Sequence, residues 1–299
     1  MTTTERHQDP KAQYPEPPFP KQQQEPPGTE DELEPKADHG EETYRGSGRL
    51  TDRVALITGG DSGIGKAVAI AMAREGADVA ISYLGGMEEP DAADTAAWVE
   101  KAGRRAIQLP GDVRDEEHCR SLVERTVSEL GNVDIVVNNA AWQKCGDRIE
   151  EMTTEEWRRI FATNIEAMFH ISKAAIPRMR EGGTIINTAS IQAYSPSPEL
   201  LPSSATKGAI VTFTKGLAQD PGVLERGLRV NAVAPGPIWT PLIPSTMPAE
   251  KAAKFGENTP LGRAGQPAEL APIYVFLASQ ESSYITGEVV GVTGGRPLG

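Results

Sequence analysis

The segment that decides the fold is "ITGGDSGIGKAVA", Ile57–Ala69. It follows a short apolar run and leads into a stretch with helical apolar spacing, which predicts a turn between a buried strand and a helix. Gly59, Gly63 and Gly65 have the spacing G-x3-G-x-G. Glycines there allow a tight turn, a close approach of a pyrophosphate and close packing of helix on strand. Because the helix N-terminus offers free N–H groups, we interpret this segment as a phosphate-binding turn.

Strands and helices alternate along the rest of the chain. Short apolar runs include "DVAIS" (78–82), "VDIVVNNAA" (133–141) and "GTIINTAS" (183–190), and between them lie helical patterns such as "DEEHCRSLVERTVSELG" (115–131). Alternation of this kind, with strands that are apolar throughout, predicts a parallel sheet covered on both faces. We therefore expect a single α/β domain over residues 49–299, a doubly wound Rossmann-type fold.

Residues 1–48 have a different composition, rich in Pro, Gln and Glu and without a hydrophobic period. Such a segment is expected to be extended or polyproline-like. One interpretation is a solvated tail. The other is an arm along a neighbouring subunit, with Tyr14, Phe19 and Tyr44 as its apolar anchors.

Composition excludes several classes of protein. A net charge of −12 argues against nucleic acid or an anionic membrane as the main partner. No apolar run reaches the ~18 residues of a membrane span, and the N-terminus lacks the apolar core of a secretory signal. The two cysteines and four histidines form neither a disulfide framework nor a metal-ligand pattern. We expect a cytoplasmic protein without a metal, acting on a small molecule.

Several motifs in order make the chain similar to the short-chain dehydrogenase/reductase family over roughly residues 50–295. "TGGDSGIG" (58–65) matches the TGxxxGxG turn, and "NNAA" (138–141) matches NNAG with Ala141 in place of glycine. "APGPIWT" (234–240) matches the PG-x-x-x-T segment that cradles the nicotinamide. The leader resembles a bacterial branch with a Pro-rich extension, whose members are often labelled stress-related or glucose/ribitol-dehydrogenase-like oxidoreductases.

The resemblance implies a seven-stranded parallel sheet of order 3-2-1-4-5-6-7, NAD or NADP as cofactor, and a homotetramer. One interface would contain the helix with Phe161 and Phe169 and the helix from about Ser204; the segment 287–295 would lie near another. "GDV" puts Asp112 where the family contacts the adenine. The cofactor-binding residues expected from the turn and the resemblance are Gly59, Asp61, Ser62, Gly63, Ile64, Gly65, Ser82, Tyr83, Asp112, Val113, Asn139, Ala140, Lys207, Pro235, Gly236, Ile238 and Thr240.

The catalytic residues implied by the family are Asn164, Ser190 and Lys207, but the family's tyrosine is missing. That tyrosine stands four residues before the lysine, on the same helix face, and here the position holds Ser203. In the family, the lysine and the oxidised nicotinamide lower the pKa of the tyrosine, which then exchanges a proton with the substrate oxygen. A serine hydroxyl is a poorer acid and is too short to reach the same oxygen. We therefore expect Ser203 to impair proton transfer.

Two functions remain open from the sequence. One is an oxidoreductase for a small alcohol, aldehyde, ketone or sugar, and the other is a catalytically inactive NAD(P)-binding module that acts as a sensor or scaffold. The intact Asn164, Ser190 and Lys207 favour an enzyme scaffold in which the tyrosine was lost recently or by a deliberate change. Water or Tyr194, four residues after Ser190, would have to relay the proton. For Tyr194 we expect instead a role in shaping the substrate loop. A third possibility is a structural protein that acts through its Pro-rich tail.

The choice of cofactor and substrate is only weakly encoded. Ser82 and Tyr83 follow the second strand and offer neither an acid for a ribose hydroxyl nor a base for a 2′-phosphate, which leans toward NAD. The substrate lid is expected at 241–260, with 191–203 as the opposite wall. Three aromatic residues could line this site or belong to the core: Trp142, Tyr194 and Trp239.

Overall fold

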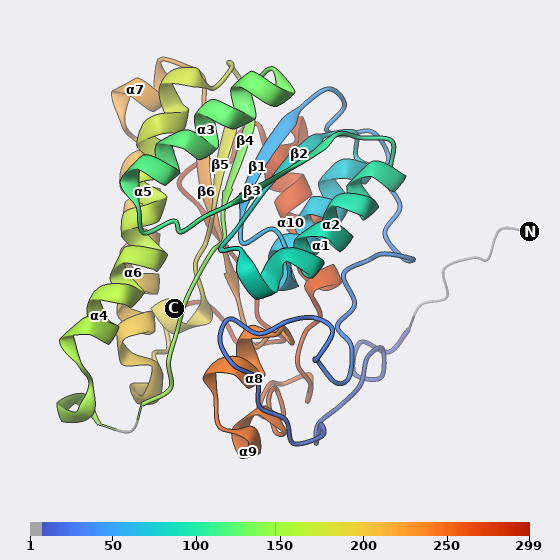
Figure 1. Cartoon of the computed structure of the whole chain (residues 1–299), viewed down its shortest axis with the longest axis vertical. Coiled ribbons are helices and arrows are strands. Elements are labelled where there is room, and N and C mark those ends of the chain that lie inside the picture. The colour runs from blue at the N-terminus through green and yellow to red at the C-terminus, as the bar shows by residue number, and fades with distance from the viewer. Residues whose placement is uncertain (1–7, 147) are drawn as a thin grey trace, which may run out of the picture.

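Seven parallel strands form one sheet in the order β3-β2-β1-β4-β5-β6-β7 in the computed structural model, which describes residues 8–146 and 148–299 (Figure 1). The predicted fold and strand order are confirmed. β1 pairs with both β2 and β4, so the direction of winding reverses beside it. The strands are β1 (Val54–Thr58), β2 (Asp78–Tyr83), β3 (Ala106–Pro110), β4 (Ile135–Asn138), β5 (Thr184–Thr188), β6 (Arg229–Pro235) and β7 (Val289–Val292).

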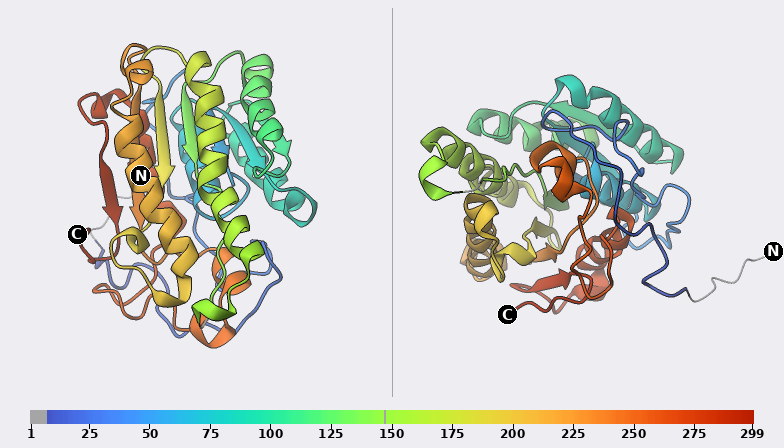
Figure 2. Two further views of the ribbon diagram at one scale, coloured as in Figure 1. Left: turned by 90° about the vertical axis from the view of Figure 1, so that its left-hand side faces the viewer. Right: turned by 90° about the horizontal axis from the view of Figure 1, so that it is seen from below.

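Helices cover both faces of the sheet (Figures 1 and 2). β1 shows why its sequence is apolar throughout: Ala55 and Ile57 pack toward α1, α2 and α10, whereas Val54 and Leu56 pack toward α3 and α5. Every residue of β1 is buried. The longer helices are α1 (Gly63–Arg74), α2 (Glu89–Lys101), α3 (Glu116–Leu130), α4 (Thr154–Phe161), α5 (Ala167–Ala175), α6 (Leu201–Leu217) and α10 (Pro267–Ala278), and the short ones are α7 (Pro221–Leu224), α8 (Leu242–Thr246) and α9 (Ala249–Ala252).

Two helices differ from the sequence prediction. The apolar period over 153–179 predicts one continuous helix, but a π-helical turn, Ala162–Glu166, separates α4 from α5. The extra residue in such a turn changes which side chains face inward, and it buries Asn164. α6 begins at Leu201 rather than at Ser204 because Pro202 is compatible with the first turn of a helix.

The N-terminal segment, residues 8–48, packs against its own domain. The ring of Phe19 lies 4.4 Å from that of Trp239, and Trp239 Nε1 donates a hydrogen bond of 2.8 Å to Pro35 O. Phe19 and Leu33 are buried in this contact. Figure 2 shows the segment running past the end of the sheet beside the last third of the chain. The interpretation as a solvated tail is therefore wrong for this part, and a contact with a neighbouring subunit stays a prediction.

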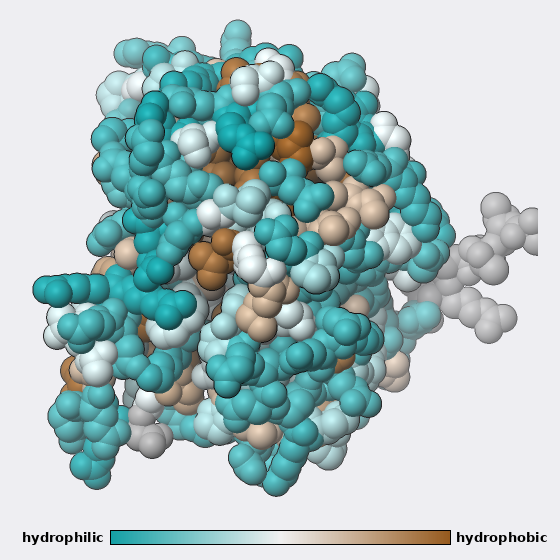
Figure 3. Space-filling model, in the orientation of Figure 1, coloured by the Kyte–Doolittle hydropathy of each residue, from teal (hydrophilic) through white to brown (hydrophobic). Residues whose placement is uncertain are grey.

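The surface agrees with the charged composition. The face seen in Figure 3 is mostly hydrophilic, and its apolar residues gather toward the middle. None of the described helices is both long and apolar enough to cross a bilayer. Within the same residues, no group of three or more His, Cys, Asp or Glu side chains could hold a metal ion.

We predict that Phe19→Ala lowers the free energy of unfolding by about 3 kcal/mol, because it empties a buried aromatic site against Trp239. Tyr284→Ala, which removes a fully exposed aromatic ring, is the control and should change it by less than about 0.5 kcal/mol. Urea denaturation at one fixed protein concentration measures both. Equal effects of the two substitutions would mean that the segment adds no stability.

Candidate active site

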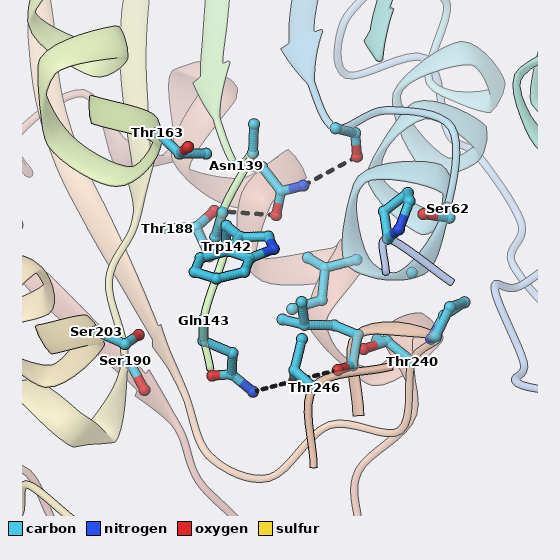
Figure 4. Close-up of a pocket in the computed structure, with 18 of the residues that line it drawn as sticks. Ser62, Asn139, Trp142, Gln143, Thr163, Thr188, Ser190, Ser203, Thr240 and Thr246 are labelled. Carbon is cyan, nitrogen blue, oxygen red and sulfur yellow. Dashed lines mark hydrogen bonds between the residues drawn. The ribbon is translucent and has the colours of Figure 1, made fainter. Parts of the chain in front are cut away.

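A cavity of about 370 Å³ lies at the carboxyl ends of the strands, where the winding reverses. Its walls include Gly59 after β1, Asn139 after β4 and Ser190 after β5 (Figure 4). In open α/β sheets this edge is where ligands bind, because the loops that leave the strands part there. The cavity is therefore lined by residues of the motifs found in the sequence.

The phosphate-binding turn is shaped by the absence of side chains. A Cβ on Gly65 would lie 1.8 Å from Gly59 O, and Gly59 itself has a φ of +59°. Asn139 holds the turn from β4, since its Nδ2 donates to Thr58 O (3.1 Å) and to Gly59 O (3.0 Å). The turn thus stays narrow and places the first residues of α1 at the cavity, where Gly63 N donates to Glu30 Oε1.

The family's serine and lysine positions meet on one side of this cavity. Ser190, Ser203 and Lys207 all line it, and Figure 4 shows the two serines on the same wall. Lys207 Nζ donates a hydrogen bond of 2.8 Å to Thr188 O, and burial lowers the pKa of this amine to about 8. Ser190 Oγ accepts a hydrogen bond from Gln192 N, which leaves its own proton free to donate.

Asn164 lies behind the wall rather than in it. Its Nδ2 donates to Trp142 O and to Thr206 Oγ1, both at 3.0 Å, and its Oδ1 accepts from Trp142 N at 2.8 Å. The side chain therefore joins the loop after β4 to α6, the helix that carries Ser203 and Lys207. The π-helical turn is what directs it there.

Tyr83, the last residue of β2, has the one phenol among the described residues that line the cavity. Its hydroxyl donates to Glu89 at 2.7 Å, so it does not take the place of the missing tyrosine. Tyr194 packs instead against the cluster around Met168, and burial, with the nearby Glu288 carboxylate, raises its pKa. This agrees with a role in shaping the loop.

The other two aromatic candidates are Trp142 and Trp239, and only one of them lines the cavity. Trp142 lines the cavity, and the guanidinium of Arg159 lies 4.3 Å from its ring centroid, a cation–π contact. Trp239 is fully buried in the core. Apolar lid residues Leu242 and Met247 complete this part of the cavity.

The predicted cofactor residues line the cavity, with Gly65 just behind the others. The sequence did not predict Pro26, Pro27, Gln143 or Arg159, which also line it. These residues belong to no motif, and only the fold brings them to this edge. The predicted residues that do line it are Gly59, Asp61, Ser62, Gly63, Ile64, Ser82, Tyr83, Asp112, Val113, Asn139, Ala140, Lys207, Pro235, Gly236, Ile238 and Thr240.

The end of the cavity next to β2 fits a nucleotide ribose. Ser82 Oγ is buried and has no hydrogen-bond partner within the described residues, so a ribose hydroxyl would satisfy it. Glu88 lines the same end and accepts a hydrogen bond of 2.7 Å from Leu84 N. Asp61 lines the cavity as well. Burial, and to a smaller extent the charge of the neighbouring Glu88, raises its pKa. With the N–H groups of the glycine turn, these residues can hold a dinucleotide.

Comparison with known proteins agrees with this geometry. Residues 59–296 match the family model described as enoyl-(acyl carrier protein) reductase. The chain is 54% identical to the uncharacterised oxidoreductase YghA of Escherichia coli, over 97% of this chain and 98% of that protein. The chain belongs to the short-chain dehydrogenase/reductase family.

Further relatives of this short-chain dehydrogenase/reductase carry functional names. It is 45% identical to the glucose and ribitol dehydrogenase of Daucus carota, covering 93% of this chain and 96% of that one. A solved short-chain dehydrogenase from Burkholderia cenocepacia, in complex with NADP, superposes with a TM-score of 0.76 at 32% identity, over 83% of this chain and 98% of that one. The chain is thus an NAD(P)-dependent oxidoreductase by family.

We predict that Gly65→Ala weakens NADH binding by about tenfold or more, because the new Cβ would force Gly59 O and the turn to move. Gly216→Ala is the control: this glycine lies in α6, and no described atom comes within 4 Å of an added Cβ there. Titration of NADH fluorescence measures both affinities. Wild-type affinity in Gly65→Ala would show that the turn does not hold the phosphates.

Proposed function

We propose that the protein transfers hydride between NAD(P) and a small alcohol, aldehyde, ketone or sugar, at a rate reduced by Ser203. The observation that supports this most is the single cavity that contains the glycine turn, Ser190 and Lys207 together. Ser203, one helical turn before Lys207, is the departure from the family pattern. The nicotinamide cofactor would supply or accept the hydride, and the chain would bind and orient the substrate.

Ser190 and Lys207 keep the geometry that their roles require. The hydroxyl of Ser190, already an acceptor for Gln192 N, is free to donate to a substrate oxygen. One proton of Lys207 is used by Thr188 O, and the other two remain for the ribose hydroxyls of the cofactor. Asn164 would act as a positioning residue, because it contacts the backbone of Trp142 and the side chain of Thr206 instead of the cavity.

Proton transfer is the step that we expect to be slow. The pKa of a serine hydroxyl is far above the ~10 of a phenol, so Ser203 can relay a proton but is a weak source. Tyr194 is packed away from the cavity. Water held between Ser190 and Ser203 is the remaining route from solvent to the substrate oxygen.

The cavity suits a substrate with both polar and apolar parts. Leu242, Met247 and Phe255 give an apolar lid surface, while Gln143 Nε2 donates to Thr246 Oγ1 at 3.0 Å across the cavity floor. Relatives named glucose and ribitol dehydrogenase and NADPH-dependent aldehyde reductase support polyols and aldehydes as the first compounds to try. NAD is the preferred cofactor in this proposal, because Glu88 at the ribose end disfavours a 2′-phosphate.

We predict that Ser203→Tyr raises turnover by about 10²–10⁴-fold, because it restores a positioned general acid one turn from Lys207. The phenol should titrate below ~10 because of the lysine charge, and a basic limb should appear in the pH–rate profile. NADH affinity should stay near wild type. The assay is NADH oxidation over a panel of aldehydes, ketones and sugars.

Ser203→Ala is the matched control, and it should leave the low rate of the wild type within about tenfold. A wild type that is already as fast as Ser203→Tyr would mean that another group donates the proton. If neither form reduces any compound although both bind NADH, the oxidoreductase proposal is wrong and the inactive NAD(P)-binding module takes its place.

We also propose a cytoplasmic homotetramer. The helices α4 and α5 present Trp157, stacked on Phe161 at 4.6 Å, and Phe169, which is 47% exposed. Exposed aromatic residues on these two consecutive helices favour an interface between subunits.

We predict that the protein sediments as a tetramer at micromolar concentration and that Phe169→Asp shifts it to smaller species, because a charge would be buried at the interface. Met87→Asp, at an exposed site outside α4, α5, α6 and the segment 287–295, should leave the tetramer intact. A monomeric wild type would contradict the proposed assembly.

A further inference from the structure

The N-terminal segment reaches the phosphate-binding turn. Glu30 Oε1 accepts a hydrogen bond of 2.7 Å from Gly63 N, the first amide of α1. The first N–H groups of a helix have no partner within the helix, and a carboxylate is stabilised by the positive end of the helix dipole. Glu30 is buried, so this contact forms inside the protein. A residue outside the family motif thus holds an amide of the glycine turn.

A buried histidine fixes the carboxylate of Glu30. His39 Nε2 lies 2.8 Å from Glu30 Oε1, and His39 Nδ1 lies 3.0 Å from Glu41 Oε1. Burial alone would lower the pKa of His39, but the two carboxylates outweigh it and raise the pKa to about 9. Burial would raise the pKa of Glu30, but the charge on His39 keeps it low. The pair is therefore ionised at neutral pH, and His39 offsets the negative charge of Glu30 beside the phosphate site.

The same segment forms part of the cavity wall and contacts the lid. Pro26 and Pro27 line the cavity. Pro27 O accepts a hydrogen bond of 3.0 Å from Ser245 Oγ in α8, and Gln24 N donates to Pro244 O at 3.1 Å. The blue chain in Figure 1 passes beside α8 at this point. Residues 24–30 thus connect the lid with the glycine turn, two parts of the cavity wall that come from distant parts of the chain.

We propose that the N-terminal segment is a working part of the cofactor site, in which Glu30 positions the phosphate-binding turn while Pro26 and Pro27 close the cavity over the nucleotide. Glu30 is a positioning residue, since it contacts the amide of Gly63 rather than the cavity. A loop held in its bound conformation loses less entropy on binding, so the contact strengthens cofactor affinity. This proposal depends on NAD(P) binding alone and not on proton transfer near Ser203.

The test compares Glu30→Ala and Glu30→Gln with Glu32→Gln, which changes an exposed acid of the same segment. NADH and NADPH fluorescence titrations, without any substrate, give the dissociation constants. We expect Glu30→Ala to weaken both by about tenfold or more, the size of one lost charge-assisted hydrogen bond. The dissociation constants of Glu30→Gln should lie between those of the wild type and Glu30→Ala, because the amide oxygen of the new side chain still accepts from Gly63 N. Glu32→Gln should stay within about twofold of wild type.

A second measurement separates positioning from general stability. Amide hydrogen exchange of the cofactor-free protein over residues 59–65 should speed up in Glu30→Ala but not in Glu32→Gln. Phe19→Ala, which destabilises the segment at a distance from the turn, should affect exchange there less than Glu30→Ala does. If Phe19→Ala and Glu30→Ala act alike at equal loss of stability, Glu30 has no special effect on the turn, and the proposal fails.

Other results would also overturn it. Wild-type affinity in a folded Glu30→Ala protein would show that the turn needs no support from the segment. Tighter binding would show that the carboxylate repels the cofactor phosphates. If Glu30→Ala does not fold, the test uses Glu30→Gln and His39→Gln instead. Wild-type affinity for NADH and NADPH in both variants would contradict the proposal. Because no turnover is measured, failure here leaves the proposed reaction untouched, and an inactive but tightly binding protein would leave this proposal standing.

Discussion

The close approach of Gly65 to Gly59 is the constraint on which the rest of the structure depends. With only 1.8 Å between Gly59 O and the place of a Cβ, α1 can start directly above the end of β1. Thr58 Oγ1 then accepts hydrogen bonds of 3.0 Å from both Asn139 N and Ala140 N, which joins the ends of β1 and β4. The strand order places the loops of β2, β5 and β6 around this point, so one narrow turn determines where the cavity lies.

The regular part of the fold was readable because the central strands β1, β2, β4, β5 and β6 are buried almost throughout and most of the long helices have an apolar face, whereas the edge strands β3 and β7 are only partly buried. The sequence failed where local pattern and tertiary structure differ. Apolar period continues through 162–166, so nothing in it marks the π-helical turn that buries Asn164. The N-terminal segment has no hydrophobic period at all, and some of its partners lie far along the chain, as Trp239 does from Phe19. The secondary-structure propensity of a segment carries no information about contacts between residues so far apart in the sequence.

The candidate site was predictable to the extent that it consists of motifs. Ser190 and most of the cofactor residues lie together because their motifs follow strands at the same edge of the sheet, and Lys207 joins them from α6. Aromatic residues could not be assigned, since a Trp or Tyr near a motif fits a core and a cavity equally well; Trp142 lines the cavity, whereas Trp239 is core. The contribution of Pro26 and Pro27 needed the three-dimensional structure.

The contacts of the N-terminal segment also have a consequence for synthesis. Pro10 O accepts a hydrogen bond from Arg263 Nε, and Asp38 O accepts one from Ala268 N. The segment is translated before the domain that it contacts, and these two partners, Arg263 and Ala268, are made near the end of that domain. Contacts so distant along the chain form late, after the intervening sheet has assembled. Glu30 can reach Gly63, 33 residues away, as soon as both have been made, whereas the carbonyls of Pro10 and Asp38 meet their partners only when the chain is nearly complete. The anchoring of the segment is therefore finished last, and a product that lacks Arg263 and Ala268 would hold it less firmly.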